Sequence, residues 1–285
     1  MSATFKAPRE KNGSHLFFAS LGRAYGGAIL FSFPILMTME MWSLGGSLDG
    51  YRIALFTLLT IPLLIGLSYY DGFEDTSTLR DDVVDTFVAY AVGFSASAVM
   101  LLLFNVIDPA MPADELIGKL SLQAIPASVG AMLAQSLLPS GDDSKSQAEE
   151  RQRSATYAGQ LFLMVVGAVF LSMSVAPTEE MLLISFKMTD RHTSALILVS
   201  LLIMQGFIVA VEYSGHTNAL SPDAPVWSVF LRYTVVGYAI ALLISFYILW
   251  TFGSIDGMPF MEQLKAAVVL GVPAAVGASA SRLIL

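Results

Sequence analysis

Two glutamates, Glu40 and Glu180, interrupt apolar stretches of the chain at matching places. Each follows a threonine by two residues, Thr38 in the first stretch and Thr178 in the second, and both pairs are separated by 140 residues. A carboxylate at the centre of a membrane helix costs about 2.5–3.5 kcal/mol on insertion scales, so its recurrence suggests a use. Carboxylate and hydroxyl oxygens are hard ligands that suit Na⁺, K⁺, Ca²⁺ or Mg²⁺. We interpret the two glutamates as ligands of one cation site, assisted by the two threonines.

A proline precedes each glutamate, Pro34 by six residues and Pro177 by three. Proline within a helix removes one backbone hydrogen bond and clashes with the preceding turn. We expect the freed carbonyl oxygens to add to the ligand set, because broken helices that line a cavity often hold ions in transporters. Glu179 has Met39 as its counterpart, so it is either a third ligand or a solvent-exposed side chain.

The alternative interpretation is structural. Each glutamate could pair with a basic residue or cap a loop, since a duplication preserves structural pairs as well as sites. If the two carboxylates do face each other in a cavity of low dielectric constant, both stay ionised only while a cation is bound. That chemistry fits exchange of protons for metal ions, and it also fits an acidic ring in a cation-selective pore.

The composition favours an all-α, polytopic transmembrane helix bundle of about eight helices. Of the 285 residues, 55% are hydrophobic and 13% are charged, and the mean hydropathy is +0.67. A bilayer core of roughly 30 Å requires about 20 apolar residues per helix. The apolar runs cover residues 24–42, 51–70, 84–107, 115–138, 156–177, 193–213, 226–252 and 261–284.

The bundle is predicted to consist of two four-helix repeats. The fourth and eighth runs share a second match, Ile125–Ala131 with Val272–Ala278, at a spacing of 147 residues. We expect a first membrane repeat over 1–138, a cytoplasmic linker over 139–155 and a second repeat over 156–285. Four crossings per half give both halves one orientation, related by an axis along the membrane normal; a re-entrant run would make the repeats inverted.

Val92–Phe94 and Val236–Tyr238 form a weaker match between the third and seventh runs.

Helix contacts are predicted from the positions of small residues. Small residues at four-residue spacing in the fourth and eighth runs predict packing of these helices against each other or across a subunit interface, with a narrow pore as the alternative; they are Gly130, Ala134, Gly277 and Ser281.

Basic residues predict that both termini lie in the cytoplasm. With that orientation ten lysines and arginines fall on the inner side and five on the outer side, the outer five being Arg52, Lys119, Lys187, Arg191 and Lys265. We therefore expect a multi-pass protein of the prokaryotic inner membrane.

Several classes of protein are disfavoured. The chain has no cysteine, which excludes thiolate metal sites, and its net charge of −8 argues against nucleic-acid binding. It has no phosphate-binding loop, nucleophile elbow or paired His-Glu motif. We expect no enzyme activity and no cofactor, with Ca²⁺, Na⁺ or K⁺ bound only as a transported ion.

The segment Arg23–Ala28, followed by Phe31–Pro34 and Met37–Trp42, carries a Thr-Met-Glu-x-Trp type of motif. It resembles the signature of an uncharacterised prokaryotic family of integral membrane proteins, and the resemblance spans most of the chain. It implies a membrane location and brings no activity, substrate or site residues.

The sequence thus predicts a cation channel or a cation/proton antiporter, with Glu40 and Glu180 near a pseudo-twofold axis. Its partners would be the lipid bilayer and small cations, with a homo-oligomer through the small-residue helices. The alternative is a non-conducting membrane scaffold or sensor that binds a partner or lipid through the acidic loop between the second and third runs. A transporter of lipids or small solutes is a third option.

Overall fold

The computed structural model describes residues 11–71, 79–108, 110–137, 156–176, 178–213 and 226–284. Every regular element within these residues is a helix, so the predicted all-α class is confirmed. The predicted linker 139–155 lies outside the described residues, as do Pro177 and most of the acidic loop after the second run.

The first half contains four long helices and one short one. They are α1 Lys11–Leu36, α2 Met39–Ser47, α3 Gly50–Asp71, α4 Leu79–Leu103 and α5 Ala113–Leu137.

The second half repeats this order, and the fourth of its five elements is made of three segments. The helices are α7 Tyr157–Val175, α8 Glu179–Lys187, α9 Asp190–Tyr213, α10 Val226–Val229, the π-helix η1 Phe230–Val235, α11 Val236–Thr251 and α12 Phe260–Ile284.

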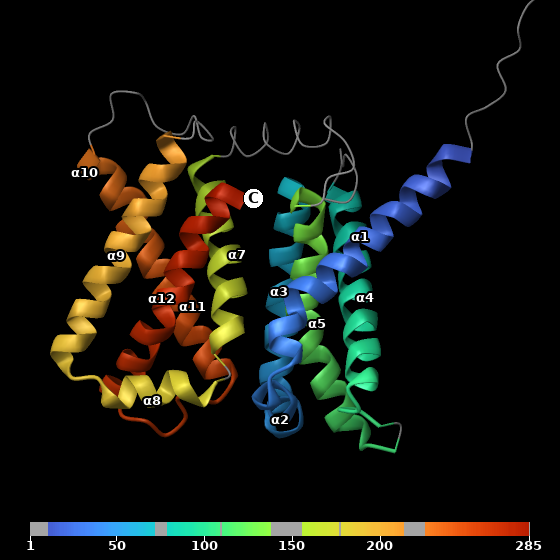
Figure 1. Ribbon diagram of the computed structural model, residues 1–285, viewed down its shortest axis with the longest axis horizontal. Coiled ribbons are helices and arrows are strands. Elements are labelled where there is room, and N and C mark those ends of the chain that lie inside the picture. Colours follow the sequence, from blue (N-terminus) through green and yellow to red (C-terminus); the bar gives the residue numbers. More distant parts are fainter. Residues whose placement is uncertain are drawn as a thin grey trace, which may run out of the picture.

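Within the described residues, seven helices are long and apolar enough to cross a membrane, and α1 with α2 forms an eighth candidate that is bent by 87°. Three predicted spans were too long, because 24–42, 84–107 and 156–177 run past the ends of α1, α4 and α7. The chain turns there, and the short helices α2 and α8 lie across one end of the bundle (Figure 1). We call this end, with the α4–α5 and α11–α12 connections, the α2/α8 end.

Each half is organised around its last helix. Helix α5 packs against α1, α2, α3 and α4, and α12 packs against their counterparts α7, α8, α9 and α11. The first and last helix of each half cross closely at glycines: a Cβ atom on Gly27 would lie 2.6 Å from the Gly130 carbonyl oxygen, and one on Gly167 would lie 2.1 Å from that of Gly277. Such close approach needs residues without side chains.

This use of the small residues corrects one prediction. Gly130 and Ala134 face Gly27 of α1, while Gly277 and Ser281 face Gly167 of α7. Helices α5 and α12 are not among the helix pairs that pack extensively in the described chain. The small residues therefore join the first and last helix within each half, where two glycine backbones meet. In the first half Gly118 of α5 also lies against the Gly45 carbonyl of α2.

The register of the fourth helix also differs from the weak sequence match. Val106 N donates to Leu101 O after α4, and Ser254 N donates to Leu249 O after α11, the same closing bond at a spacing of 148 residues. The match of Val92–Phe94 with Val236–Tyr238 has a spacing of 144, about one helical turn away.

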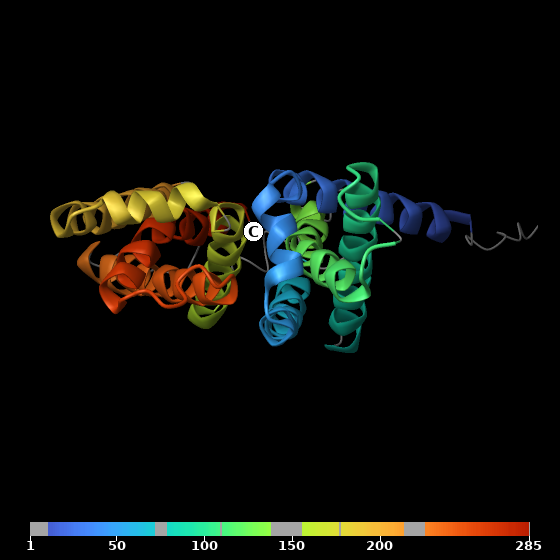
Figure 2. The same ribbon diagram turned by 90° about the horizontal axis from the view of Figure 1, so that it is seen from below.

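The halves lie side by side, with α7 at their boundary (Figure 2). Helix α3 of the first half contacts α7 and α11 of the second. Its counterpart α9 lies at the far edge of the molecule (Figure 1). Helix α7 also contacts its counterpart α1, but the contacts of α3 are not matched by α9, so the described boundary departs from the predicted arrangement around a pseudo-twofold axis.

One aromatic contact at this boundary has no counterpart. The Phe162 side chain covers Gly66 of α3, where a Cβ atom would lie 2.4 Å from the ring, and it stacks on Tyr70 at 6.1 Å. At the repeat spacing of 140 residues the counterpart of Phe162 is Gly22. Gly22 and Gly206, the counterpart of Gly66, both have nothing within 4 Å of a built Cβ atom. The equivalent contact therefore cannot form.

Candidate functional site

Thr38 and Thr178 close the helices that precede the two glutamates. Both threonines have extended backbones, with ψ of 125° and 138°. The Thr38 hydroxyl donates to the Ile35 carbonyl at 2.8 Å, and the Thr178 hydroxyl donates to the Val175 carbonyl at 2.9 Å. The Trp42 indole N–H donates to the Leu36 carbonyl at 2.7 Å. Three carbonyls at the ends of α1 and α7 thus accept hydrogen bonds from side chains.

The glutamates begin the short helices. Glu40 lies in the first turn of α2 and is partly buried, whereas Glu179 and Glu180 lie in the first turn of α8 and are exposed. Both acids therefore lie outside the long helices, because the chain leaves α1 and α7 before it reaches them. A carboxylate in a first turn also stabilises its helix through the macrodipole, by about 0.3–1 kcal/mol.

The residue after each repeated glutamate points inward. Met41 and Met181 are buried in one apolar cluster that both halves share, together with Phe56, Ile125 and Phe252. An apolar core thus lies between α2 and α8. In the part of the chain that the structure describes, no group of three or more His, Asp or Glu residues is placed to hold a metal ion.

The charges at the α2/α8 end are unbalanced. The described segments 37–52, 104–108, 110–119, 178–191 and 252–265 hold ten acidic and five basic residues. Three of the basic residues are paired within this end. Lys119 binds Glu115 at 2.6 Å, Lys265 binds Glu262 at 3.2 Å, and Arg52 binds Asp256 at 2.8 Å.

Glu40, Glu179 and Glu180 make no ion pair with any described residue. The end therefore presents unpaired negative charge, which raises the local concentration of cations.

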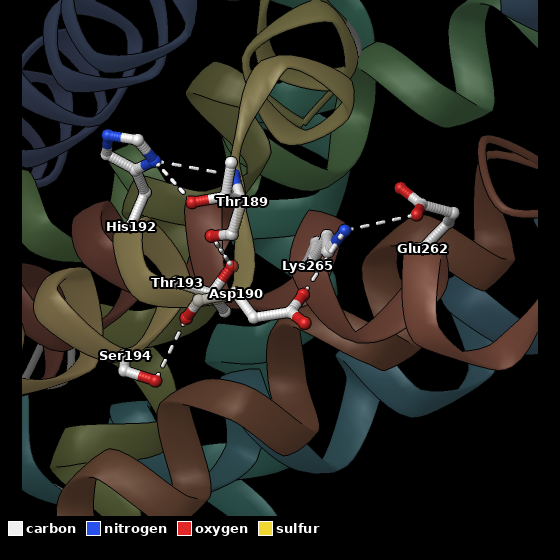
Figure 3. A network of polar contacts seen from close by, with 7 residues as sticks. All are labelled: Thr189, Asp190, His192, Thr193, Ser194, Glu262 and Lys265. Carbon is white, nitrogen blue, oxygen red and sulfur yellow. Dashed lines mark hydrogen bonds and ion pairs between the residues drawn. The ribbon is translucent and has the colours of Figure 1, made fainter.

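The two lysine pairs belong to a repeated element that the sequence interpretation overlooked. Met111–Pro112 and Glu115 recur as Met258–Pro259 and Glu262 at the spacing of 147 residues. In the second half Lys265 also reaches Asp190 of α9 at 3.6 Å (Figure 3). This pattern could have been found by extending the match of the fourth and eighth runs toward their N-terminal ends.

Some buried polar atoms have no hydrogen-bond partner. Ser172 Oγ and both amide atoms of Gln123 are in this group. Ser32, the counterpart of Ser172, donates to the Ala28 carbonyl. At the 147-residue spacing of the last helices, the counterpart of Gln123 is the buried Leu270. The unpartnered atoms therefore do not repeat between the halves.

Comparison with known proteins adds one finding. Residues 20–285 match the model of a family described as putative integral membrane protein (DUF2391). The chain belongs to this family. The match includes both halves, and it agrees with the resemblance carried by the segment from Arg23 to Trp42. No curated protein and no solved structure matches the chain. Membership in this family, together with the apolar helices, establishes a multi-pass integral membrane protein.

Proposed function

We propose that this family member moves a small inorganic cation across its membrane, as a channel or as a cation/proton antiporter. One observation carries the proposal: both halves place an unpaired glutamate, Glu40 or Glu180, in the first turn of a short helix at the same end of the bundle. In this proposal the glutamates act at the mouth of the path. Thr38 and Thr178 fix the turn that presents them, and Glu179 adds charge.

The proposal includes an orientation. The five basic residues predicted to lie outside are all at the α2/α8 end. The other ten lysines and arginines of the sequence are predicted to lie on the inner side, and that excess favours a cytoplasmic location for both termini. The α2/α8 end would then face away from the cytoplasm of a prokaryotic cell. The proposal involves no catalytic step and no resident cofactor.

Cation flux into proteoliposomes tests this function. We expect flux of Na⁺, K⁺ or Ca²⁺ through the wild-type protein, with or without an opposing proton gradient. The Glu40→Gln/Glu180→Gln double variant should lower the flux roughly tenfold at about 0.01 M salt, where charges act over about 30 Å. The loss should shrink near 0.15 M salt, where the screening length is about 8 Å.

Glu179→Gln is the matched control, because it removes one charge from the same helical turn at a position without a counterpart. Its effect should be smaller than that of Glu180→Gln. Equal flux in the double variant and the wild type would remove the assigned residues. No flux of any of these ions through the wild-type protein would overturn the function itself.

A non-conducting scaffold or sensor is favoured by a different observation, the apolar cluster around Met41 and Met181 that lies between the two short helices. That function predicts no flux and a partner or lipid bound through the acidic loop after α3. Loss of the partner in a pull-down after removal of this loop would support it.

A further inference from the structure

Arg52 begins α3 in the first half and reaches into the second half. It is only 8% exposed. Its Nη1 donates to the Trp250 carbonyl at 2.7 Å, and its Nη2 lies 2.8 Å from the Asp256 carboxylate. The guanidinium also lies over the indole of Trp250, 5.1 Å from the ring centroid. One side chain thus makes a hydrogen bond, an ion pair and a cation–π contact across the boundary between the halves.

The end of α11 is shaped to receive this guanidinium. Trp250 supplies one of the last carbonyls of the helix, where the macrodipole favours a cation. Gly253 turns the chain with a φ of +69°, and a Cβ atom there would lie 3.3 Å from Arg52 Nη1. Glycine therefore provides both the left-handed turn and the space for the arginine.

The second half has no equivalent of this contact. His192 is the counterpart of Arg52 at the repeat spacing of 140 residues. Its Nδ1 makes a local hydrogen bond with the Thr189 hydroxyl at 2.8 Å, as Figure 3 shows. The nearby pairs of Lys265 with Asp190 and Glu262 stay within the second half, and the pair of Lys119 with Glu115 stays within the first.

Other described contacts between the halves are made by aromatic rings. Phe31 meets Phe170 at 5.6 Å, and Phe56 meets Tyr247 at 5.9 Å and Phe252 at 6.2 Å. Apolar contacts are non-directional, so they tolerate sliding and tilting. A guanidinium held by a carbonyl, a carboxylate and an indole permits one position.

We propose that Arg52, Asp256 and the Trp250 carbonyl form a latch that holds the two halves together at the α2/α8 end, and that release of this latch lets the halves separate there. The latch itself does not depend on the proposed function. Only its consequence does, namely that separation of the halves gives a cation access to the interior.

The latch can be tested without measuring transport. The chain has no cysteine, so Ser47→Cys and Ser194→Cys place one spin label on an exposed position of each half. Distances between the labels are measured by double electron–electron resonance on the full-length protein in lipid nanodiscs. The variants are Asp256→Asn, Arg52→Gln and Arg52→Lys. Lys119→Gln is the matched control, because it breaks an ion pair at the same end within one half.

We expect one narrow distance distribution for the otherwise unchanged labelled protein and for Lys119→Gln. Asp256→Asn and Arg52→Gln should add a longer distance, and Arg52→Lys should add it partly, because lysine keeps the charge but loses the forked geometry. The Asp256 side chain is 52% exposed, so this variant is expected to fold even if Arg52→Gln does not. An unchanged distribution in folded Asp256→Asn would overturn the latch and leave the proposed cation transport intact. A longer distance between the labels in Asp256→Asn, together with no cation flux through the wild-type protein, would support the latch and contradict only the proposed transport.

Discussion

Gly167 sets how closely α7 approaches α12, and replacing it with alanine measures the value of that approach. A Cβ atom at Gly167 would lie 2.1 Å from the Gly277 carbonyl oxygen and 2.7 Å from the Ser281 Cβ. Carbon–oxygen contacts between helices normally span about 3.3–3.6 Å, so the two helices must separate by about 1 Å. The Gly277 carbonyl oxygen belongs to the backbone, so it cannot move away by a side-chain rotation.

The free energy of unfolding that Gly167→Ala loses can be estimated from close packing. Adding a methyl group to a packed core destabilises a protein by about 1–3 kcal/mol, and we take about 3 kcal/mol because the whole crossing must widen. Alanine recovers about 1 kcal/mol of helix propensity. The net loss of about 2 kcal/mol lowers Tm by about 4–8 °C, on a scale of roughly 2–4 °C per kcal/mol for a chain of this size class.

Thermal unfolding of the detergent-purified protein is the assay, with Gly206→Ala as the control. Gly206 is an exposed helical glycine with nothing within 4 Å of a built Cβ atom, so alanine there should leave Tm unchanged or raise it. Gly27→Ala in the first half should repeat the loss, since its Cβ atom would lie 2.6 Å from the Gly130 carbonyl oxygen. If Gly167→Ala unfolds at or above the temperature of Gly206→Ala, the crossing is not held by close backbone contact.

Three further substitutions test the α2/α8 end. Thr178→Val removes the hydroxyl that caps the Val175 carbonyl and should cost about 0.5–1.5 kcal/mol in SDS-induced unfolding; no change would mean that the carbonyl finds another donor. Trp42→Phe removes the donor to Leu36 and should expose α2 to faster hydrogen exchange, while exchange in α8 stays as in the wild type. Gly253→Ala forces a side chain into a left-handed turn at φ +69° and should cost about 1 kcal/mol or more of thermal stability; a neutral result would contradict the close contact with the guanidinium.

The positions of the long helices could be predicted from the sequence, because apolar runs of about 20 residues have few other uses. The close crossings also left a signal, in the repeated pairs of Gly27 with Gly130 and Gly167 with Gly277. The sequence interpretation chose the wrong partner for Gly130 and Gly277, since small residues show that a helix approaches something closely without showing which helix that is.

The burial of the glutamates could not be predicted from hydropathy. Apolar residues continue beyond Thr38 and Thr178, because α2 and α8 cover the end of the core with Met41 and Met181. An apolar run indicates that its residues contact an apolar environment, but it does not indicate where the chain changes direction. The latch was also missed, because the interpretation relied on residues that recur, and Arg52 is replaced by His192 in the other half.

The asymmetric contact between the halves has a consequence for how many such units can associate. Joining one surface of a unit to a different surface of the next is a heterologous, head-to-tail association, which builds open rows unless it closes into a ring. Here the Phe162 ring of the second half packs over Gly66 of the first half. The second half has an uncovered glycine at the equivalent position, Gly206, but the first half has Gly22 in place of the phenylalanine that would cover it. This contact therefore occurs once, between the two halves of a single chain.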